Sequence, residues 1–106
     1  MANVFKNYLA SATGTSPASV YTVAGATTAV TIGMNIANIA TAQIKVSAYI
    51  SSGGTDYYIA KDVPIPAGSA LSVLDGKIIL EAADVVKVVS DTAASADTVL
   101  SVLEQS

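Results

Sequence analysis

Apolar and polar residues alternate with a period of two along two central segments of the chain. In residues 30–36 every second position is apolar, namely Val30, Ile32, Met34 and Ile36. Residues 44–50 repeat the pattern with Ile44, Val46, Ala48 and Ile50, and between them stand Lys45, Ser47 and Tyr49. Successive side chains of a strand point to opposite faces, so each segment is predicted to be a strand with one apolar face.

Turn-forming residues divide the rest of the chain into further short strands. Gly53 and Gly54 supply the positive φ that a hairpin turn at residues 51–54 requires, and residues 55–61 follow as the returning strand. Pro64 and Pro66 have no amide hydrogen to donate, so segment 63–68 is expected at a sheet edge or in a crossover. The other predicted strands cover residues 2–9, 19–23, 69–74, 77–80, 84–89 and 97–104, with a loop at 10–18 and a turn at Asp75–Gly76.

These elements predict one all-β domain over residues 1–106. About eight short strands at close spacing are typical of an antiparallel β-sandwich, either jelly-roll-like or immunoglobulin-like. Residues 1–10 could alternatively form an extended arm instead of a strand of the sandwich. A helix over residues 82–89 or 91–103 is the other alternative, which the β-branched residues there disfavour.

The composition adds that the surface carries few ions. Charged residues make up 12% of the chain, where about 25% is usual. Hydrophobic residues make up 52%, so Ser, Thr, Asn, Gly and Ala must cover the outside. Burying such a surface against a neighbour strands few charges away from water. We therefore expect the chain to work within a larger protein assembly, in which partner subunits also cover the strand edges.

The same composition argues against several classes of function. The net charge is −3 and all five cations are Lys, without the clustered basic face that nucleic-acid binding needs. Cys and His are absent, so zinc, copper and most iron sites lose their usual ligands, and we expect no cofactor. Polar residues and Pro17 interrupt the uncharged stretch 7–44, and no basic leader precedes the apolar residues near the start. Neither a membrane span nor a signal peptide is expected.

Candidate catalytic groups are few because the chain has no His. A Ser–Lys pair is the nucleophilic variant that is left, with Ser47 two residues after Lys45, although solvent-facing strand residues explain the same pattern. The carboxylates that could form acid–base pairs or ligate calcium are Asp56, Asp62, Asp75, Glu81, Asp84, Asp91 and Asp97. Nearly all stand at turns or strand ends, where Asp bonds the local backbone, and their spacing is not that of a calcium loop. We expect neither an enzyme nor a metal site.

Tyr57 and Tyr58 form a candidate aromatic patch next to the predicted glycine turn. Such a patch docks a sugar or a protein. Adjacent strand residues point to opposite faces, so the alternative is one Tyr in the core and the other at the rim as an interface anchor.

Four segments resemble small virion structural proteins of tailed bacteriophages, notably marine and cyanobacterial ones. They are Val4–Asn7 (VFKN), Tyr57–Ser69 (YYIAKDVPIPAGS), Asp75–Asp84 (DGKIILEAAD) and Leu100–Glu104 (LSVLE), so the likeness extends over almost the whole chain. The resemblance implies a β-sandwich subunit displayed on or within a virion, and it carries no active-site residues across. It leaves open a capsid, neck, tail or baseplate position.

The resemblance and the low charge together lead us to expect a non-enzymatic virion structural protein made in the host cytoplasm. A capsid cement or decoration subunit that stabilises the particle is the leading expectation, and its partners would be copies of itself, as a homotrimer or another symmetric oligomer, and the major capsid protein. The alternatives are a neck, tail or baseplate component, or a tail module that binds a receptor glycan. Interface residues are expected to include Val4, Phe5, Tyr8, Tyr57, Tyr58, Pro64 and Pro66.

Overall fold

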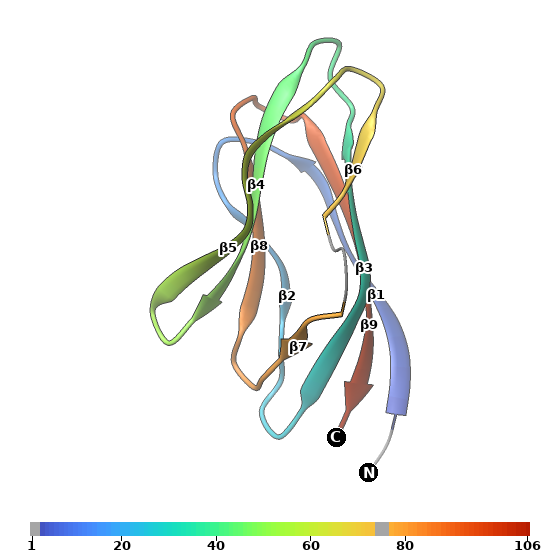
Figure 1. The fold of residues 1–106 in the computed structure, drawn as a ribbon, viewed down its shortest axis with the longest axis vertical. Coiled ribbons are helices and arrows are strands. Elements are labelled where there is room, and N and C mark those ends of the chain that lie inside the picture. Colours follow the sequence, from blue (N-terminus) through green and yellow to red (C-terminus); the bar gives the residue numbers. More distant parts are fainter. Residues whose placement is uncertain (1–2, 74–76) are drawn as a thin grey trace.

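The computed structural model describes residues 3–73 and 77–106 and places nine β-strands in two packed antiparallel sheets (Figure 1). No helix occurs in these two ranges, so the alternative of a helix over 82–89 or 91–103 is wrong. The strands are β1 (Asn3–Thr13), β2 (Ala18–Thr22), β3 (Thr28–Asn38), β4 (Ile44–Ser52), β5 (Thr55–Ile65), β6 (Ala70–Ser72), β7 (Ile79–Leu80), β8 (Val85–Ser90) and β9 (Ala96–Gln105).

The strand order is that of a jelly roll. Sheet A has the order β1-β9-β3-β6, with β7 also paired to β3, and sheet B has the order β2-β8-β4-β5. The first strand therefore pairs with the last, the second with the last but one, and the fourth with the fifth, as in a long hairpin that is rolled up. The predicted all-β sandwich is confirmed, and of its two forms the jelly roll is the one observed.

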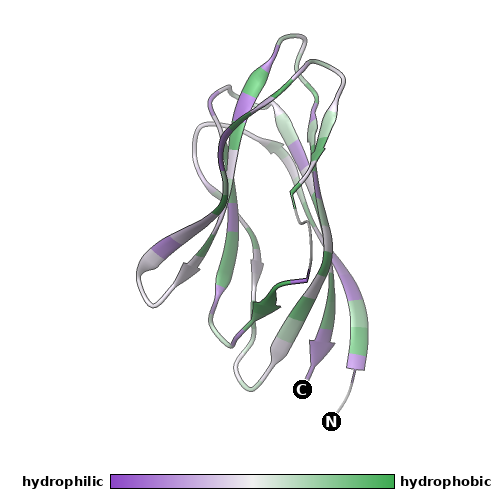
Figure 2. Cartoon of the chain, in the orientation of Figure 1, coloured by the Kyte–Doolittle hydropathy of each residue, from purple (hydrophilic) through white to green (hydrophobic). Residues whose placement is uncertain are grey.

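The core lies between the two sheets and is mainly aliphatic, although Tyr21 and Met34 belong to it and Thr31 and Thr98 are also buried. Figure 2 shows bands of apolar and polar residues that succeed one another along the strands. Inward-facing residues of both sheets meet in one cluster, and its largest fully buried aliphatic side chains are Ile36, Ile44, Ile65, Leu80, Leu100, Val23, Val46, Val86, Val88 and Val102.

A β-bulge in β3 changes which side chains of the predicted apolar face reach the core. Thr31 pairs with Val102 and Gly33 pairs with Ser101, so Ile32 is an extra residue on β3. Because one extra residue reverses the alternation, Val30 and Ile32 lie on the outer face whereas Met34 and Ile36 are buried. The prediction that all four share one face is therefore wrong.

The hairpin of β4 and β5 follows the prediction at its turn and departs from it further along. Gly53 and Gly54 have φ values of 59° and 84°, as the predicted turn requires. β5 is an edge strand that runs through Pro64 to Ile65, in agreement with the expected edge position. Two register shifts against β4 bend it, and Asp62, beside one of them, has φ 51°.

The N-terminal segment is part of a sheet. From residue 3 onward it pairs with β9 in β1, which continues to Thr13, so the loop predicted at 10–18 is shorter than expected and is confined to residues 14–17. A second bulge lies between Ala10 and Thr13, where Ala12 has φ 51°. The predicted turn at Asp75–Gly76 lies outside the described residues.

The bulge predicts unequal effects of the same substitution at two positions of β3. Ile36→Ala removes a side chain that is 0% exposed and should lower the free energy of unfolding by about 2–5 kcal/mol. Ile32→Ala removes a side chain that is 47% exposed and should cost less than about 1 kcal/mol. Urea unfolding of the two variants measures both values, and equal losses would contradict the bulged register.

Candidate functional site

The outer face of sheet A is an exposed surface of apolar and uncharged polar side chains. The strand register places on it Phe5, Asn7 and Leu9 of β1, Val99, Ser101 and Leu103 of β9, Val30, Ile32 and Asn35 of β3, and Ile79 of β7. Among the outward positions of the described residues of β1, β9 and β3, the single charged side chain is Asp97. Asp97 Oδ1 accepts a hydrogen bond from the backbone N–H of Ala12 at 2.7 Å, which offsets part of its charge locally.

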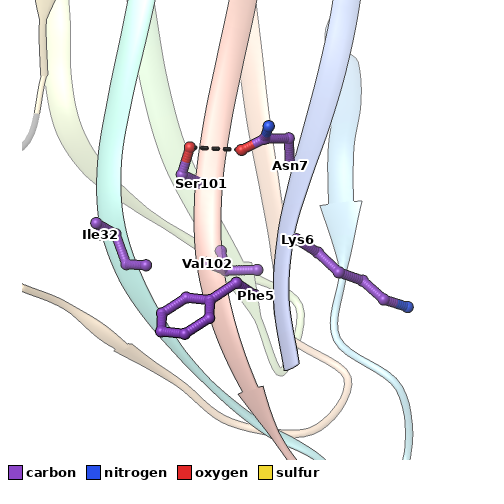
Figure 3. Close-up of a pocket in the computed structure, with 6 residues that line it drawn as sticks. All are labelled: Phe5, Lys6, Asn7, Ile32, Ser101 and Val102. Carbon is purple, nitrogen blue, oxygen red and sulfur yellow. Dashed lines mark hydrogen bonds between the residues drawn. The ribbon is translucent and has the colours of Figure 1, made fainter. Parts of the chain in front are cut away.

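Two shallow hollows lie on this face, one at each side of Asn7. The Phe5 hollow, of about 280 Å³, is lined by Phe5, Lys6, Asn7, Ile32, Ser101 and Val102. In Figure 3 the Phe5 ring extends toward Ile32 across β9, and the Lys6 side chain points away from it. The Leu9 hollow, of about 270 Å³, is lined by Leu9, Ala10, Ser11, Asp97, Thr98 and Val99.

A hydrogen bond between β1 and β9 separates the two hollows. Ser101 Oγ donates to Asn7 Oδ1 at 2.7 Å, and Figure 3 shows the pair bridging the two strands. Within the described residues the amide nitrogen of Asn7 has no side-chain or backbone acceptor. The centre of the face is therefore polar and has an unused donor, and each hollow is lined by both apolar and polar residues, with Asp97 among those of the Leu9 hollow.

A polar cluster lies on the inner side, where β1, β2 and β9 meet. Tyr8 and Tyr21 stack with ring centroids 4.1 Å apart, and their hydroxyls donate to Glu104 Oε2 at 2.7 and 2.6 Å. Lys6 Nζ lies 3.5 Å from Glu104 Oε1. The four side chains come from both sheets, so the cluster links sheet A to sheet B.

The cluster fixes the protonation state of its members. Hydrogen bonds from Tyr21 and Tyr8 lower the pKa of Glu104, and Lys6 lowers it further. Burial, followed by the hydrogen bond to Glu104, raises the pKa of Tyr21 well above its usual range and also raises the pKa of Tyr8. Glu104 is therefore a weak base held by two neutral phenols, an arrangement that stabilises the fold and does not suit general base catalysis.

The residues expected at an interface do not gather at one place. Phe5 lies on the outer face of sheet A, Val4 points to the other side of β1, and Tyr8 is engaged in the Glu104 cluster. Pro64 and Pro66 are exposed at the far end of β5 and beyond it.

Tyr57 and Tyr58 are both exposed near the end of the β4–β5 hairpin, so the expectation that one of them lies in the core is wrong. The hairpin extends past the sandwich there (Figure 1). Tyr58 contacts Tyr49 with ring centroids 5.0 Å apart, and Lys61 Nζ lies 4.9 Å from the Tyr58 ring.

Ser47 is not paired with Lys45 through its hydroxyl. It is buried on the outer side of sheet B, where its Oγ accepts the backbone N–H of Asp62 at 2.9 Å and donates to Asp62 Oδ1 at 3.5 Å. Lys45 is exposed. The expectation that both are solvent-facing is therefore wrong for Ser47, which lies where the register of β5 against β4 shifts and bonds Asp62 there.

Three of the candidate carboxylates, Asp84, Asp91 and Asp97, accept backbone N–H groups, and of these bonds the one from Glu81 to Asp84 is local in the chain. Asp91 Oδ1 accepts the N–H of Lys45 and the hydroxyl of Thr92, and these bonds lower the pKa of Asp91. Asp84 accepts the Ser52 hydroxyl at 2.6 Å and the N–H of Glu81 at 3.0 Å. Asp75 lies outside the described residues. In residues 3–73 and 77–106 no three acidic side chains gather in a metal-binding arrangement.

The described segments also contain no helix of the length and hydropathy needed to cross a membrane.

Sequence reasoning missed most of the outer face and the whole Glu104 cluster. The apolar side chains that are exposed on this face include Leu9, Ile32, Ile79 and Val99. The period of two instead predicts that Ile32 faces the core. Tyr8, Tyr21 and Glu104 are far apart in the chain, so no local pattern connects them. The sequence feature that indicates such a face is the low content of charged residues, which is too small to cover the whole surface of the chain.

No protein-family model matches the chain, and no curated protein matches it. Among solved structures it is similar to a Bacillus endospore appendage, of a family of disulfide-linked pili, with a TM-score of 0.50 and 17% sequence identity. The match covers 99% of this chain and 85% of that chain. At this identity the likeness concerns the fold alone, and the predicted resemblance to phage virion proteins stays a prediction.

Replacing Glu104 with Gln is expected to lower the free energy of unfolding by about 1–3 kcal/mol at pH 7. The pKa of Glu104 is lower in the folded chain than its ordinary value of 4.5, so its contribution is present above that pH and is lost as the pH falls through the folded pKa. The pKa of Tyr21 is raised in the folded chain, so the stability contributed by its neutral hydroxyl is lost as the pH rises above the ordinary Tyr value of 10.0. In urea unfolding the difference from wild type should be constant from about pH 6 to about pH 9 and shrink toward about pH 3.

Glu81→Gln is the matched control, because Glu81 is exposed and its replacement by Gln removes the same negative charge. Its effect should stay within about 0.5 kcal/mol over the same pH range. A Glu104→Gln difference that grows on acidification would refute the role given to the cluster.

Proposed function

We propose that this chain is a non-enzymatic structural subunit that assembles in several copies through uncharged β-sheet surface. The observation that carries the proposal is the outer face of sheet A, where Phe5, Leu9 and Ile79 are more than half exposed with few charged neighbours. Monomeric proteins rarely expose a continuous apolar patch of more than a few hundred Å². We therefore expect another protein to cover a face of this composition in the assembled state.

Strand edges provide a second means of assembly. β1 lies at the edge of sheet A, and among the described residues β9 is its one partner strand. An 11-residue edge with unpaired backbone groups accepts a further strand by backbone hydrogen bonding. The β5 edge of sheet B is less suited to this, because β5 has two register shifts and contains Pro64.

The proposed setting is a virus particle, in which the chain acts as a capsid cement or decoration subunit. The support for this setting is the resemblance of four segments to phage virion proteins, which also leaves a neck, tail or baseplate position open. The similar fold of the endospore appendage supports the broader class, since that protein forms pili. Those pili are disulfide-linked, whereas this chain has no Cys, so disulfide links do not join its copies.

A glycan-binding module is the second candidate, favoured by the exposure of Tyr58, which contacts Tyr49 on the face of the β4–β5 hairpin that Asp56 shares; Tyr57 points to the opposite face. Aromatic faces with a nearby carboxylate bind sugars by stacking and hydrogen bonding. Binding to a glycan array that is lost in Tyr58→Ala and kept in Tyr57→Ala would support this candidate over assembly.

The proposal predicts concentration-dependent association of the purified chain. Sedimentation velocity from about 1 µM to about 500 µM should show a monomer that converts to a defined oligomer, because burial of uncharged surface gives micromolar affinity or better. Raising the salt concentration should not dissociate the oligomer, since few ion pairs hold it. A chain that stays monomeric over the whole range, and forms no ordered particle in electron micrographs, would refute self-assembly.

A further inference from the structure

Resting on the proposed function, we propose that the outer face of sheet A is where two copies pack face to face about a twofold axis. Phe5 of each copy enters the Leu9 hollow of the other, and Asn7 lies near the axis. The partner is therefore a second copy of this chain, and the contact is the same on both copies.

The size of the face matches what such a contact needs. β1, β9 and β3 contain 11, 10 and 11 residues. At ~4.8 Å between strands and ~3.3 Å per residue, they present roughly 500 Å² in flat projection, and the side chains enlarge this area. β6 and β7 extend the face beyond β3. A specific interface buries at least about 1,000 Å² in total, or about 500 Å² on each partner, so this face is large enough for a small specific contact.

The side chains that protrude from the face are those that gain most from being covered. The exposed fractions are 73% for Phe5, 68% for Leu9, 66% for Ile79, 47% for Ile32 and 42% for Val99. An apolar side chain that leaves water contributes in proportion to the area it buries. The exposed area is therefore concentrated in the residues that line or flank the two hollows.

The charges permit a copy of the chain to be the partner. Two copies of a face that carried several like charges would repel each other, whereas this face has Asp97 alone among the outward positions of β1, β9 and β3 in the described chain. Three of the five Lys, namely Lys45, Lys61 and Lys87, lie on strands of sheet B. The outer face of sheet A thus has no strong field that would select a partner of opposite charge.

The arrangement along β1 is self-complementary. Phe5 and Leu9 point outward from the same strand, four residues or about 13 Å apart, and Asn7 is midway between them. A twofold axis that lies in the interface plane, runs perpendicular to β1 and passes through Asn7 places each Phe5 over the other copy's Leu9 hollow. It also brings the unused Asn7 amide opposite the partner copy's Asn7–Ser101 pair, so the polar centre gains acceptors.

Such a contact closes on itself. An interface that is identical on both copies uses up the face and yields a dimer, so growth into a larger assembly must use another surface, such as the β1 edge. The dimer is then the building unit of the proposed assembly.

Three single substitutions test the contact by sedimentation equilibrium. Phe5→Asp and Ile32→Asp should each weaken dimerisation at least about 100-fold, because the change occurs twice in a symmetric dimer and buries a charge. Tyr57→Asp, an equally polar change at an aromatic residue that is 59% exposed on the β4–β5 hairpin, should leave dimerisation unchanged. Urea unfolding of each variant as a monomer checks its fold, and Ile32→Ser replaces Ile32→Asp if the latter does not fold.

The outcomes separate the contact from the proposed function. Ile32 is on β3, two strands in from the β1 edge of sheet A. If Phe5→Asp abolishes dimers and the Ile32 variant does not, the copies pair through the edge of β1, and the face-to-face contact is overturned. Oligomers that persist in both variants also overturn it, while self-assembly stands. A wild-type chain that never associates overturns both, and the face then belongs to a protein of different sequence.

A cross-link locates the axis. The chain has no Cys, so Asn7→Cys introduces a single thiol. Facing sheets lie about 10 Å apart, which is too far for a direct disulfide, so a short bifunctional thiol reagent is the probe. It should join two copies of Asn7→Cys at micromolar concentration, and it should not join two copies of Tyr57→Cys. Equal rates of cross-linking for the two variants would overturn the placement of the axis at Asn7.

Discussion

Backbone pairing on both sides of β9 is the interaction on which the rest of the fold depends. β9 pairs with β1 from Asn3–Gln105 to Thr13–Ala96 and with β3 from Thr28–Gln105 to Asn38–Ala96. This double register decides which side chains of three strands face the core and which face outward. The Phe5 and Leu9 hollows, the Asn7–Ser101 bond and the Glu104 cluster all lie at the β1–β9 pairing, so each depends on its register.

The two sheets differ in how they meet solvent. Sheet B carries Lys45, Lys61 and Lys87 on its strands and covers Ser47 and Tyr49 with the bent β5. Sheet A has an outer face with almost no ions. The low charge of the composition is therefore unevenly distributed, and one sheet retains ordinary solvation while the other favours burial against protein. This asymmetry is the feature on which the proposed structural function rests.

Strands and turns could be read from local pattern, whereas the orientation of several side chains could not. The alternation in β4, the Gly53–Gly54 turn and the edge position of Pro64 follow from neighbouring residues alone. The bulge at Ile32 is visible only against the register of β9, because an extra residue has no signature in alternation by itself. Burial of Ser47 and the meeting of Tyr8, Tyr21 and Glu104 depend on contacts between distant segments, which sequence patterns do not contain.

The pairing of β1 with β9 also has a kinetic consequence. Sheet A cannot close until residues about a hundred positions apart in the chain have met, and such non-local pairing is slow. During that interval the side of β9 that receives β1 is open, and the β1 of a neighbouring molecule fits it as well as the chain's own. Crowded folding therefore favours exchange of the first strand between molecules, which would yield intertwined dimers that dissociate only by unfolding.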